Sequence, residues 1–293
     1  MGIAKPAVKL LMQEGLQRPF YGSILTLGRQ SVLLTFKQLL ATAESMGYPL
    51  KRDIALELSS DPGHRRRGFV SDRFLFLSLG FAEVFSLDYS DYEQSDYLGD
   101  LNIRNIFLVV SKQFDFVLDS GTIEHIFHLP NALGNIFDLT RVGGRIMHLS
   151  PSSNYLDHGF YMFSPTLFFD FYTANAFKIE KISMIKHARC RYNGPWRIYD
   201  YIPGKLDKIS SGGLDGGFYG IALIAMKTAQ STSDNIPQQG IFTNRLWLQS
   251  TKEYQPSVMK EMLKKIPGLQ DFVLFLRKVF LKKGLRLPLT DVF

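Results

Sequence analysis

Apolar residues gather in short continuous runs that alternate with stretches of helical spacing. The clearest run is residues 114–118, FDFVL, which ends at Asp119 and a Ser-Gly turn. Runs of this kind are typical of strands that are buried on both faces of a parallel sheet. The stretch that follows places Leu133 and Ile136 on one face of a helix, and residues 145–149 return to a strand pattern. We therefore predict a strand–helix–strand unit over this part of the chain.

The same patterns predict the other elements of an α/β fold. Gly143 and Gly144 stand where the helix of the central unit would end in a left-handed cap. The remaining expected elements are a lead-in helix within 1–20, a strand at 21–29, a helix at 31–46, a strand at 54–60, a helix at 69–80, strands at 82–88 and before Asp100, a helix from Ser164, and strands at 178–187 and 218–227. Strands that alternate with helices favour a Rossmann-like, doubly wound and mostly parallel sheet.

Changes in composition divide the chain into a main domain, a linker and an appendage. The main domain spans 1–228 and contains an insertion at 47–68. Within it, the aromatic and turn-rich segment 189–217 is a candidate substrate cap. Residues 229–240 read as a polar linker. Residues 241–293 are expected to form a basic, amphipathic, helical appendage.

The positive charge is concentrated near the C-terminus. The net charge is +7, and the isoelectric point is ≈ 9.3. Between Lys260 and Arg286, eight basic residues stand against two acidic ones, so most of the excess lies in this segment. The main domain is therefore near neutral, and we do not expect it to bind nucleic acid. The one cysteine, Cys190, excludes an internal disulfide and a cysteine-cluster zinc site.

Residues 259–286 interleave basic residues with apolar ones at helical spacing. Packing on the main domain or on a second copy of the chain is one interpretation. Contact with an anionic membrane face is the other, since each basic residue near such a surface contributes about 1 kcal/mol. The N-terminus lacks the features of a secretory signal, and no stretch approaches the ~20 apolar residues that span a bilayer. We expect a cytoplasmic protein, with peripheral contact at the inner membrane face as the alternative.

Three features follow one another in the central part of the chain. They are Asp119 at a strand end, the pair Glu124 and His125 that opens a helical segment, and the turn 143–144. In this order they resemble the second half of the class I S-adenosylmethionine-dependent methyltransferases, and the resemblance covers about 24–151. It implies a sheet that ends in an antiparallel pair of strands. It also implies S-adenosylmethionine as cofactor, bound at the carboxyl ends of the parallel strands.

The resemblance gives cofactor roles to residues that follow the strands. Gly28 stands in the turn where the backbone has to approach the methionine and ribose parts of the cofactor. Asp88 ends the second strand and would accept hydrogen bonds from both ribose hydroxyls. Asp100, after the third strand, would meet the adenine amino group, with Leu101 as a wall of the adenine pocket. The remaining expected cofactor residues are Asp119 and Glu124.

A polar-aromatic loop before Ser164 carries the candidate catalytic groups. The run at 157–165, DHGFYMFSP, together with DLN at 100–102, resembles a bacterial branch of the same superfamily. Substrate-contacting groups of the superfamily often come from this region. It contains Asp157 and His158.

Methyl transfer to an oxygen requires alignment of donor and acceptor and removal of a proton, for which histidine is suited. We prefer His158, beside Asp157, as the base. His125 is a second candidate, and His148, inside an apolar strand, is expected to be a core residue. No metal site is expected, because the histidines and carboxylates show no spaced ligand pair such as HxxxH.

The predicted function is O-methylation of a small or carbohydrate-like acceptor. A binding or scaffold module without catalysis is an alternative, since only Gly28 stands where the family places two or three glycines. A nicotinamide-dependent oxidoreductase is a third interpretation that shares Gly28 and Asp88. It lacks the GxGxxG fingerprint and gives no role to Glu124 and His125.

Overall fold

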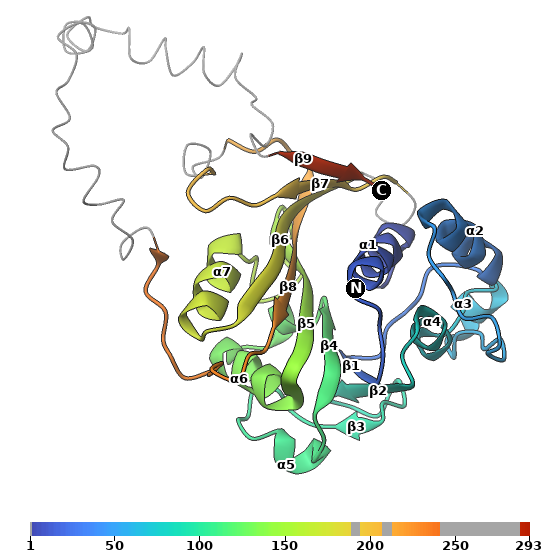
Figure 1. The fold of residues 1–293 in the computed structure, drawn as a ribbon, viewed down its shortest axis with the longest axis horizontal. Coiled ribbons are helices and arrows are strands. Elements are labelled where there is room, and N and C mark those ends of the chain that lie inside the picture. Colours follow the sequence, from blue (N-terminus) through green and yellow to red (C-terminus); the bar gives the residue numbers. More distant parts are fainter. Residues whose placement is uncertain (1, 189–193, 207–212, 241–287) are drawn as a thin grey trace, which may run out of the picture.

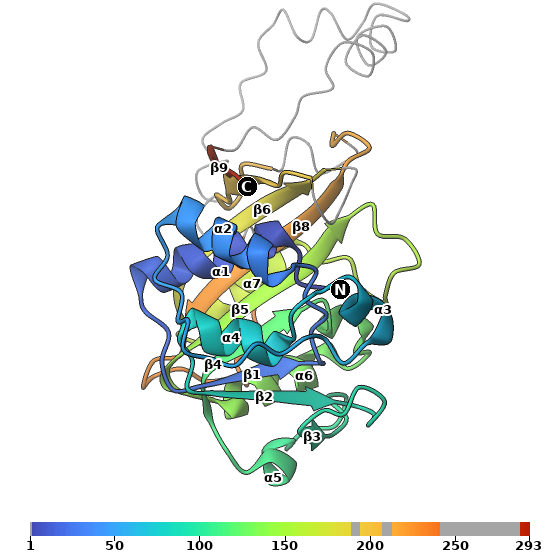
Figure 2. The ribbon, with the colours of Figure 1, turned by 90° about the vertical axis from the view of Figure 1, so that its right-hand side faces the viewer.

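The structure is a computed structural model, and it describes residues 2–188, 194–206, 213–240 and 288–293. Within these residues the chain forms one mixed sheet with helices on both faces (Figures 1 and 2). Across the sheet the nine described strands are β3 (Tyr97–Leu98), β2 (Glu83–Asp88), β1 (Ser23–Leu27), β4 (Phe114–Ser120), β5 (Thr140–Ser153), β8 (Phe218–Met226), β6 (Lys178–His187), β7 (Arg197–Asp200) and β9 (Leu289–Val292).

The sheet has a parallel half and an antiparallel half. Neighbouring strands from β3 to β5 pair in parallel. From β5 onward, through β8, β6, β7 and β9, every neighbouring pair is antiparallel. The predicted Rossmann-like sheet with an antiparallel end is thus confirmed, and the fold is the one that the family resemblance implies.

Helices cover both faces of this sheet. They are α1 (Lys5–Gln17), α2 (Phe36–Met46), α3 (Pro62–Arg66), α4 (Asp72–Leu79), α5 (Phe107–Val110), α6 (Leu129–Leu139) and α7 (Pro165–Ala174), with a 3-10 turn η1 at Ile123–His125. Ile24 and Phe116 pack into one core with α1, α2 and α4, whereas their neighbours Leu25 and Val117 pack into a second core with α6 and α7. Because both faces are covered, the central strands need apolar residues at consecutive positions.

A buried ion pair fixes α1 to the sheet. Arg145 on β5 donates from Nη1 to Glu14 Oε1 at 2.6 Å, and both side chains are almost fully buried. The same guanidinium also donates to the carbonyl oxygens of Arg18 and Pro19. Removal of one partner of such a pair costs roughly 3–5 kcal/mol. The helix is therefore a firm part of the domain, and its first turn forms one wall of the pocket described below.

The helix after β1 begins later than predicted. It is capped by Thr35 rather than starting at Ser31, and Thr35 forms a reciprocal capping box with Gln38. This Thr-x-x-Gln pattern is the stronger start signal because it satisfies two backbone N–H groups at once. The residues in between cross toward the N-terminus, where Val32 pairs with Ile3 in a parallel bridge.

Gly143 and Gly144 lie inside β5 and do not cap α6. The helix ends at Leu139, and the strand begins at once with Thr140. Gly143 has a φ of +80°, and a β-carbon at Gly144 would lie 3.0 Å from the carbonyl oxygen of Phe114. The two glycines therefore allow a bulge where β5 shifts its register against β4.

The insertion at 47–68 also differs from the prediction. Its expected strand at 54–60 is reduced to an isolated bridge between Leu58 and Val70. The basic run that follows forms α3, which is capped by Asp61 through a 2.7 Å hydrogen bond from the N–H of His64.

None of the described helices has the length and apolar character needed to cross a membrane.

The last described residues return to the sheet. β9 pairs with β7, and Phe293 and Trp196 exchange backbone hydrogen bonds of 2.7 and 2.8 Å. The sequence pattern places these residues in the expected appendage. Residues 241–287, which include the predicted contact surface at 259–286, lie outside the described residues. So do Cys190 and parts of the predicted substrate cap.

Candidate functional site

Gly28 and Asp88 meet at the carboxyl ends of β1 and β2. Gly28 has a φ of +73°, and its N–H donates to the carbonyl of Leu87 at 2.7 Å. A β-carbon at Gly28 would lie 3.7 Å from the Asp88 carboxylate and 3.4 Å from Oγ1 of Thr122. The glycine is thus required for its backbone conformation, whereas a β-carbon would make only ordinary contacts with these groups. The predicted pairing of the turn glycine with the acidic strand end is present in the structure.

Asp88 is partly exposed, and its carboxylate bonds to the backbone of the segment that follows β2. Its Oδ1 accepts from the N–H of Tyr89 at 2.6 Å. Asp100 lies two residues after β3 and accepts from the backbone and side-chain nitrogens of Asn102, both at 2.8 Å. Leu101 is only 5% exposed and belongs to the core that contains α6. Asp88 is therefore placed at the strand ends as expected, whereas Leu101 contributes mainly to packing.

The turn after Gly28 is fixed by a buried carboxylate on α4. Asp72 accepts from the backbone N–H of Gln30 at 3.1 Å and from the guanidinium of Arg29 at 3.3 Å. The amide of Gln30 donates to the carbonyl oxygens of Leu27 and Gly28. These contacts hold the turn where the family has additional glycines. No sequence pattern points to Asp72, because it opens an ordinary helical stretch.

Asp119, His148 and Tyr172 form a fully buried network. Asp119 Oδ2 lies 2.7 Å from His148 Nδ1, and His148 Nε2 lies 2.6 Å from the hydroxyl of Tyr172. The other oxygen of Asp119 accepts from the N–H groups of Thr122 and Ile123. Burial raises the pKa of Tyr172 well above its ordinary value, as does nearby Asp119. The network holds the β4 end and η1 in place, and His148 is a core residue as predicted.

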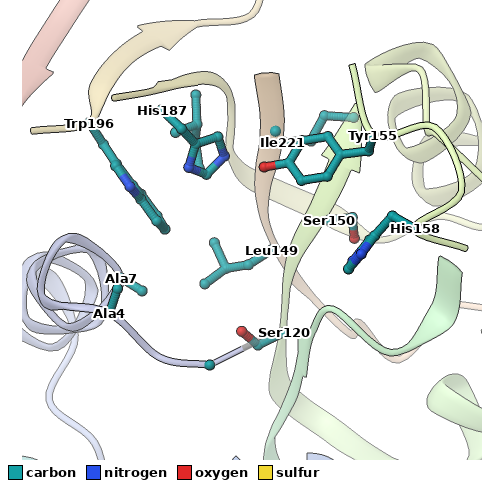
Figure 3. A pocket seen from close by; sticks show the side chains of 13 residues that line it. Ala4, Ala7, Ser120, Leu149, Ser150, Tyr155, His158, His187, Trp196 and Ile221 are labelled. Carbon is teal, nitrogen blue, oxygen red and sulfur yellow. The ribbon is translucent and has the colours of Figure 1, made fainter. Parts of the chain in front are cut away.

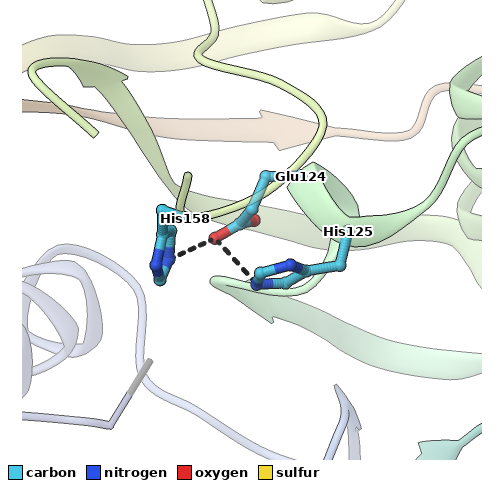
Figure 4. Close-up of side chains that lie close together, drawn as sticks. All are labelled: Glu124, His125 and His158. Atoms are coloured by element: carbon cyan, nitrogen blue, oxygen red, sulfur yellow. Dashed lines mark ion pairs between the residues drawn. The ribbon is translucent and has the colours of Figure 1, made fainter. Parts of the chain in front are cut away.

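Glu124, His125 and His158 form a second, more open cluster (Figure 4). Glu124 Oε1 lies 3.5 Å from His158 Nε2 and 4.0 Å from His125 Nε2. The glutamate side chain is fully buried, whereas those of His125 and His158 are 46% and 29% exposed. Burial, followed by the charge of Asp119, raises the pKa of Glu124 to about 8. Burial also lowers the pKa of His125.

The loop that carries His158 packs closely against the backbone of Glu124, and Gly159 makes this close packing possible. A β-carbon at Gly159 would lie only 2.8 Å from the carbonyl oxygen of Glu124. That carbonyl accepts from the N–H of Phe160 at 2.8 Å. Asp157 has a φ of +59° and is exposed, and it does not belong to the cluster. The predicted catalytic pair is therefore split, with His158 facing Glu124 and Asp157 facing outward.

A pocket of ≈ 160 Å³ lies beside the cluster. Figure 3 shows Ala4 and Ala7, at the start of α1, across from Tyr155 and His158. The far end of the pocket is formed by Trp196. The centroid of its ring lies 4.5 Å from the centroid of the His187 ring. The pocket is also lined by Ser120, at the end of β4, and by Ser150 in β5. His158 is thus shared by the pocket and the cluster.

Sequence reasoning missed several of these groups. Ala4 and Ala7 have no functional groups, so their residue type does not indicate a site. His187 and Trp196 reach the pocket from the antiparallel half, and only the sheet order brings them near His158. Thr122 could have been suspected, because it lies two residues before the Glu-His pair.

Several solved structures are similar to this chain over most of its length. A SAM-dependent methyltransferase from Archaeoglobus fulgidus is 12% identical, with a TM-score of 0.38 over 76% of this chain and 95% of that one. A 1,6-didemethyltoxoflavin-N1-methyltransferase from Burkholderia thailandensis, solved with 1,6-didemethyltoxoflavin and S-adenosylhomocysteine, is 13% identical, with a TM-score of 0.34 over 76% and 78%. No protein-family model matches the sequence, and no curated protein matches it. Because these TM-scores lie below 0.5, function has to be inferred from the residues of this chain.

Proposed function

We propose that the protein binds S-adenosylmethionine and methylates an oxygen of a small or carbohydrate-like acceptor. One observation carries this proposal. The carboxylate of Asp88 lies 3.7 Å from the β-carbon position of Gly28, at the carboxyl ends of two adjacent parallel strands. This is the place where open α/β sheets bind nucleosides, and a carboxylate there can accept hydrogen bonds from two ribose hydroxyls.

The residues at these strand ends suit the cofactor. Gly28 has no side chain between the strand ends, and Asp88 is a partly exposed residue. Asp100 follows β3 at the same edge and remains the candidate for the adenine amino group. When bound, S-adenosylmethionine supplies a methyl group on a positively charged sulfur that an acceptor oxygen can displace in line.

The pocket beside His158 is proposed to hold the acceptor. Its volume of ≈ 160 Å³ is well below the roughly 300–1,000 Å³ of sites for drug-sized ligands. It therefore suits one ring or one small group rather than a large molecule. Tyr155 and Trp196 offer apolar faces, while Ser120 and Ser150 offer hydroxyl groups that can orient a polar acceptor.

His158 is proposed to receive the acceptor proton. It lines the pocket, and its Nε2 lies 3.5 Å from the buried Glu124 carboxylate. Ionisation of Glu124 at that distance would stabilise the imidazolium that forms when the proton is taken up. His125, on the other side of Glu124, is the second candidate, and Asp157 can act only through the loop that it shares with His158.

Calorimetric titration of the purified full-length protein with S-adenosylhomocysteine tests the proposal. We expect saturable binding to the wild type. Replacement of Asp88 by alanine should weaken it at least about tenfold, because hydrogen bonds to a charged group contribute roughly 1.5–3 kcal/mol each. Asp91→Ala, an exposed acidic residue of the same connection, should bind like the wild type.

A folded wild-type protein that does not bind S-adenosylhomocysteine would remove the methyltransferase proposal. It would leave the alternative of a binding module that keeps the sheet without the cofactor. Binding that survives unchanged in Asp88→Ala would show instead that the ligand lies elsewhere. Circular dichroism of each variant separates loss of binding from loss of fold.

A further inference from the structure

The cluster of Glu124, His125 and His158 contains a buried carboxylate that lacks hydrogen bonds within the described part of the chain. The Glu124 carboxylate is fully buried, yet among the described residues neither of its oxygens has a hydrogen-bond partner. Buried carboxylates are normally hydrogen-bonded or paired, because an uncompensated buried charge is costly. Figure 4 shows this carboxylate between the two imidazole rings.

The three side chains converge on one point. One ligand atom from each, two imidazole nitrogens and one carboxylate oxygen, lie within 4.8 Å of one another. Four-coordinate zinc has bonds of about 2.0–2.2 Å to such atoms, which places neighbouring ligand atoms roughly 3.3 Å apart. The distances from Glu124 Oε1 of 3.5 Å to His158 and 4.0 Å to His125 are a little larger than this. Small side-chain rotations would therefore complete the geometry.

The backbone around the cluster keeps these groups together. η1 presents Glu124 and His125 side by side, and its position is fixed by the bonds from Thr122 and Ile123 to Asp119. On the opposite side, the docking of Gly159 on the Glu124 carbonyl sets the position of His158. Neither segment shows a metal motif by itself. The ligand set arises only where the two segments meet.

We propose that Glu124, His125 and His158 bind a divalent transition-metal ion, with zinc as the best-suited metal. Two histidines and one carboxylate form a ligand set of catalytic zinc sites, which leave a fourth position open. The same set also serves iron(II) in a facial triad. Because His158 lines the pocket, an ion held by these residues would lie next to the space proposed for the acceptor.

This inference rests on the proposed methyl transfer and gives it a means of activating the acceptor. A bound divalent ion lowers the pKa of an oxygen ligand, so an acceptor hydroxyl would lose its proton to solvent. The oxygen would then form a bond to the methyl carbon while the carbon–sulfur bond breaks and its electron pair stays on sulfur. In the metal-bound state His158 is a ligand and does not act as the base.

Zinc binding to the full-length protein tests the inference without any methyl transfer. The protein is prepared without a polyhistidine tag, stripped with a chelator, and titrated with zinc in competition with a chromophoric chelator. We expect one zinc ion per chain. His158→Ala and Glu124→Gln should each weaken zinc binding by more than about 100-fold. Replacement of residues that only hydrogen-bond to a metal ligand already weakens binding roughly 10–100-fold.

His128→Ala is the matched control. His128 is an exposed histidine three residues from His125, and it does not belong to the cluster. Its replacement should leave zinc affinity unchanged. Cobalt(II) absorption in the visible range, lost in His158→Ala and kept in His128→Ala, provides a second readout of the coordination. If His158→Ala does not fold, His125→Ala takes its place.

Absence of stoichiometric zinc binding would overturn the inference, as would equal affinity in the wild type, His158→Ala and Glu124→Gln. Binding of S-adenosylhomocysteine by the same samples separates this result from the proposed function. Cofactor binding without zinc binding would leave His158 as the base, whereas zinc binding without cofactor binding would leave a metal site without methyl transfer.

Discussion

Two histidine–carboxylate arrangements lie at the carboxyl ends of β4 and β5, and they differ in how completely they are satisfied. Asp119 and His148 are fully buried, and four donors surround the carboxylate: the N–H groups of Thr122 and Ile123, His148 Nδ1 and Ser150 Oγ. Glu124 is equally buried, but its ion pairs are with two partly exposed imidazoles at 3.5 and 4.0 Å.

The difference indicates which arrangement is structural and which is available for chemistry. A carboxylate with all its hydrogen bonds made is fixed by them and has nothing to offer a ligand. A carboxylate without them, placed beside accessible histidines and a pocket, can take a proton or a cation. A carboxylate and a histidine therefore have a structural role in the first arrangement and are available for chemistry in the second.

The largest expected effect is on the satisfied arrangement. Asp119→Ala leaves His148 and two backbone N–H groups without their acceptor, and it should lower the free energy of unfolding by about 3–5 kcal/mol. Urea denaturation measures this change. Asp91→Ala, which removes an exposed carboxylate, should stay within about 0.5 kcal/mol of the wild type. A loss below about 1 kcal/mol in Asp119→Ala would contradict a structural role.

A smaller effect is expected where the loop docks beside the open arrangement. Gly159→Ala places a β-carbon 2.8 Å from the Glu124 carbonyl, so the loop has to move. Overpacking of this kind costs about 1–3 kcal/mol of unfolding free energy. Gly216→Ala is the matched control, since nothing lies within 4 Å of its β-carbon position. Equal stability of the two variants would argue against tight docking.

The remaining effect is a pH dependence of the free energy of unfolding that comes from Glu124. Its pKa is raised from 4.5 to about 8, so the folded protein keeps a proton that the unfolded chain releases. Between these two pH values the folded state binds more protons, and stability falls as the pH rises. Glu124→Gln should remove this decline. Urea denaturation of both proteins from pH 5 to 8, with a chelator present, measures it. Parallel curves would mean that the pKa is not raised.

Much of the fold was predictable because the sheet leaves clear marks in the sequence. The runs ending at Asp88 and Asp119 had to be strands, since both faces of the central sheet are covered. Gly143 and Gly144 were misassigned because a glycine pair serves a helix cap and a strand bulge equally well. The C-terminal strand β9 could not be foreseen, as four residues that pair with an edge strand carry little pattern of their own.

The candidate site was only partly predictable for a different reason. Residues at strand ends, such as Gly28 and Asp88, are brought together by the regular geometry of a parallel sheet. By contrast, His158 reaches Glu124 from a loop, and the pocket wall at Trp196 comes from the antiparallel half. Such meetings depend on loop conformation and on strand order, which residue spacing along the chain does not encode.

A crystal structure of the full-length protein with S-adenosylhomocysteine tests the central claim most directly. We predict that both ribose hydroxyls lie within hydrogen-bond distance of the Asp88 carboxylate and that the sulfur faces the pocket lined by His158. A ligand bound away from Gly28 and Asp88 would contradict the claim.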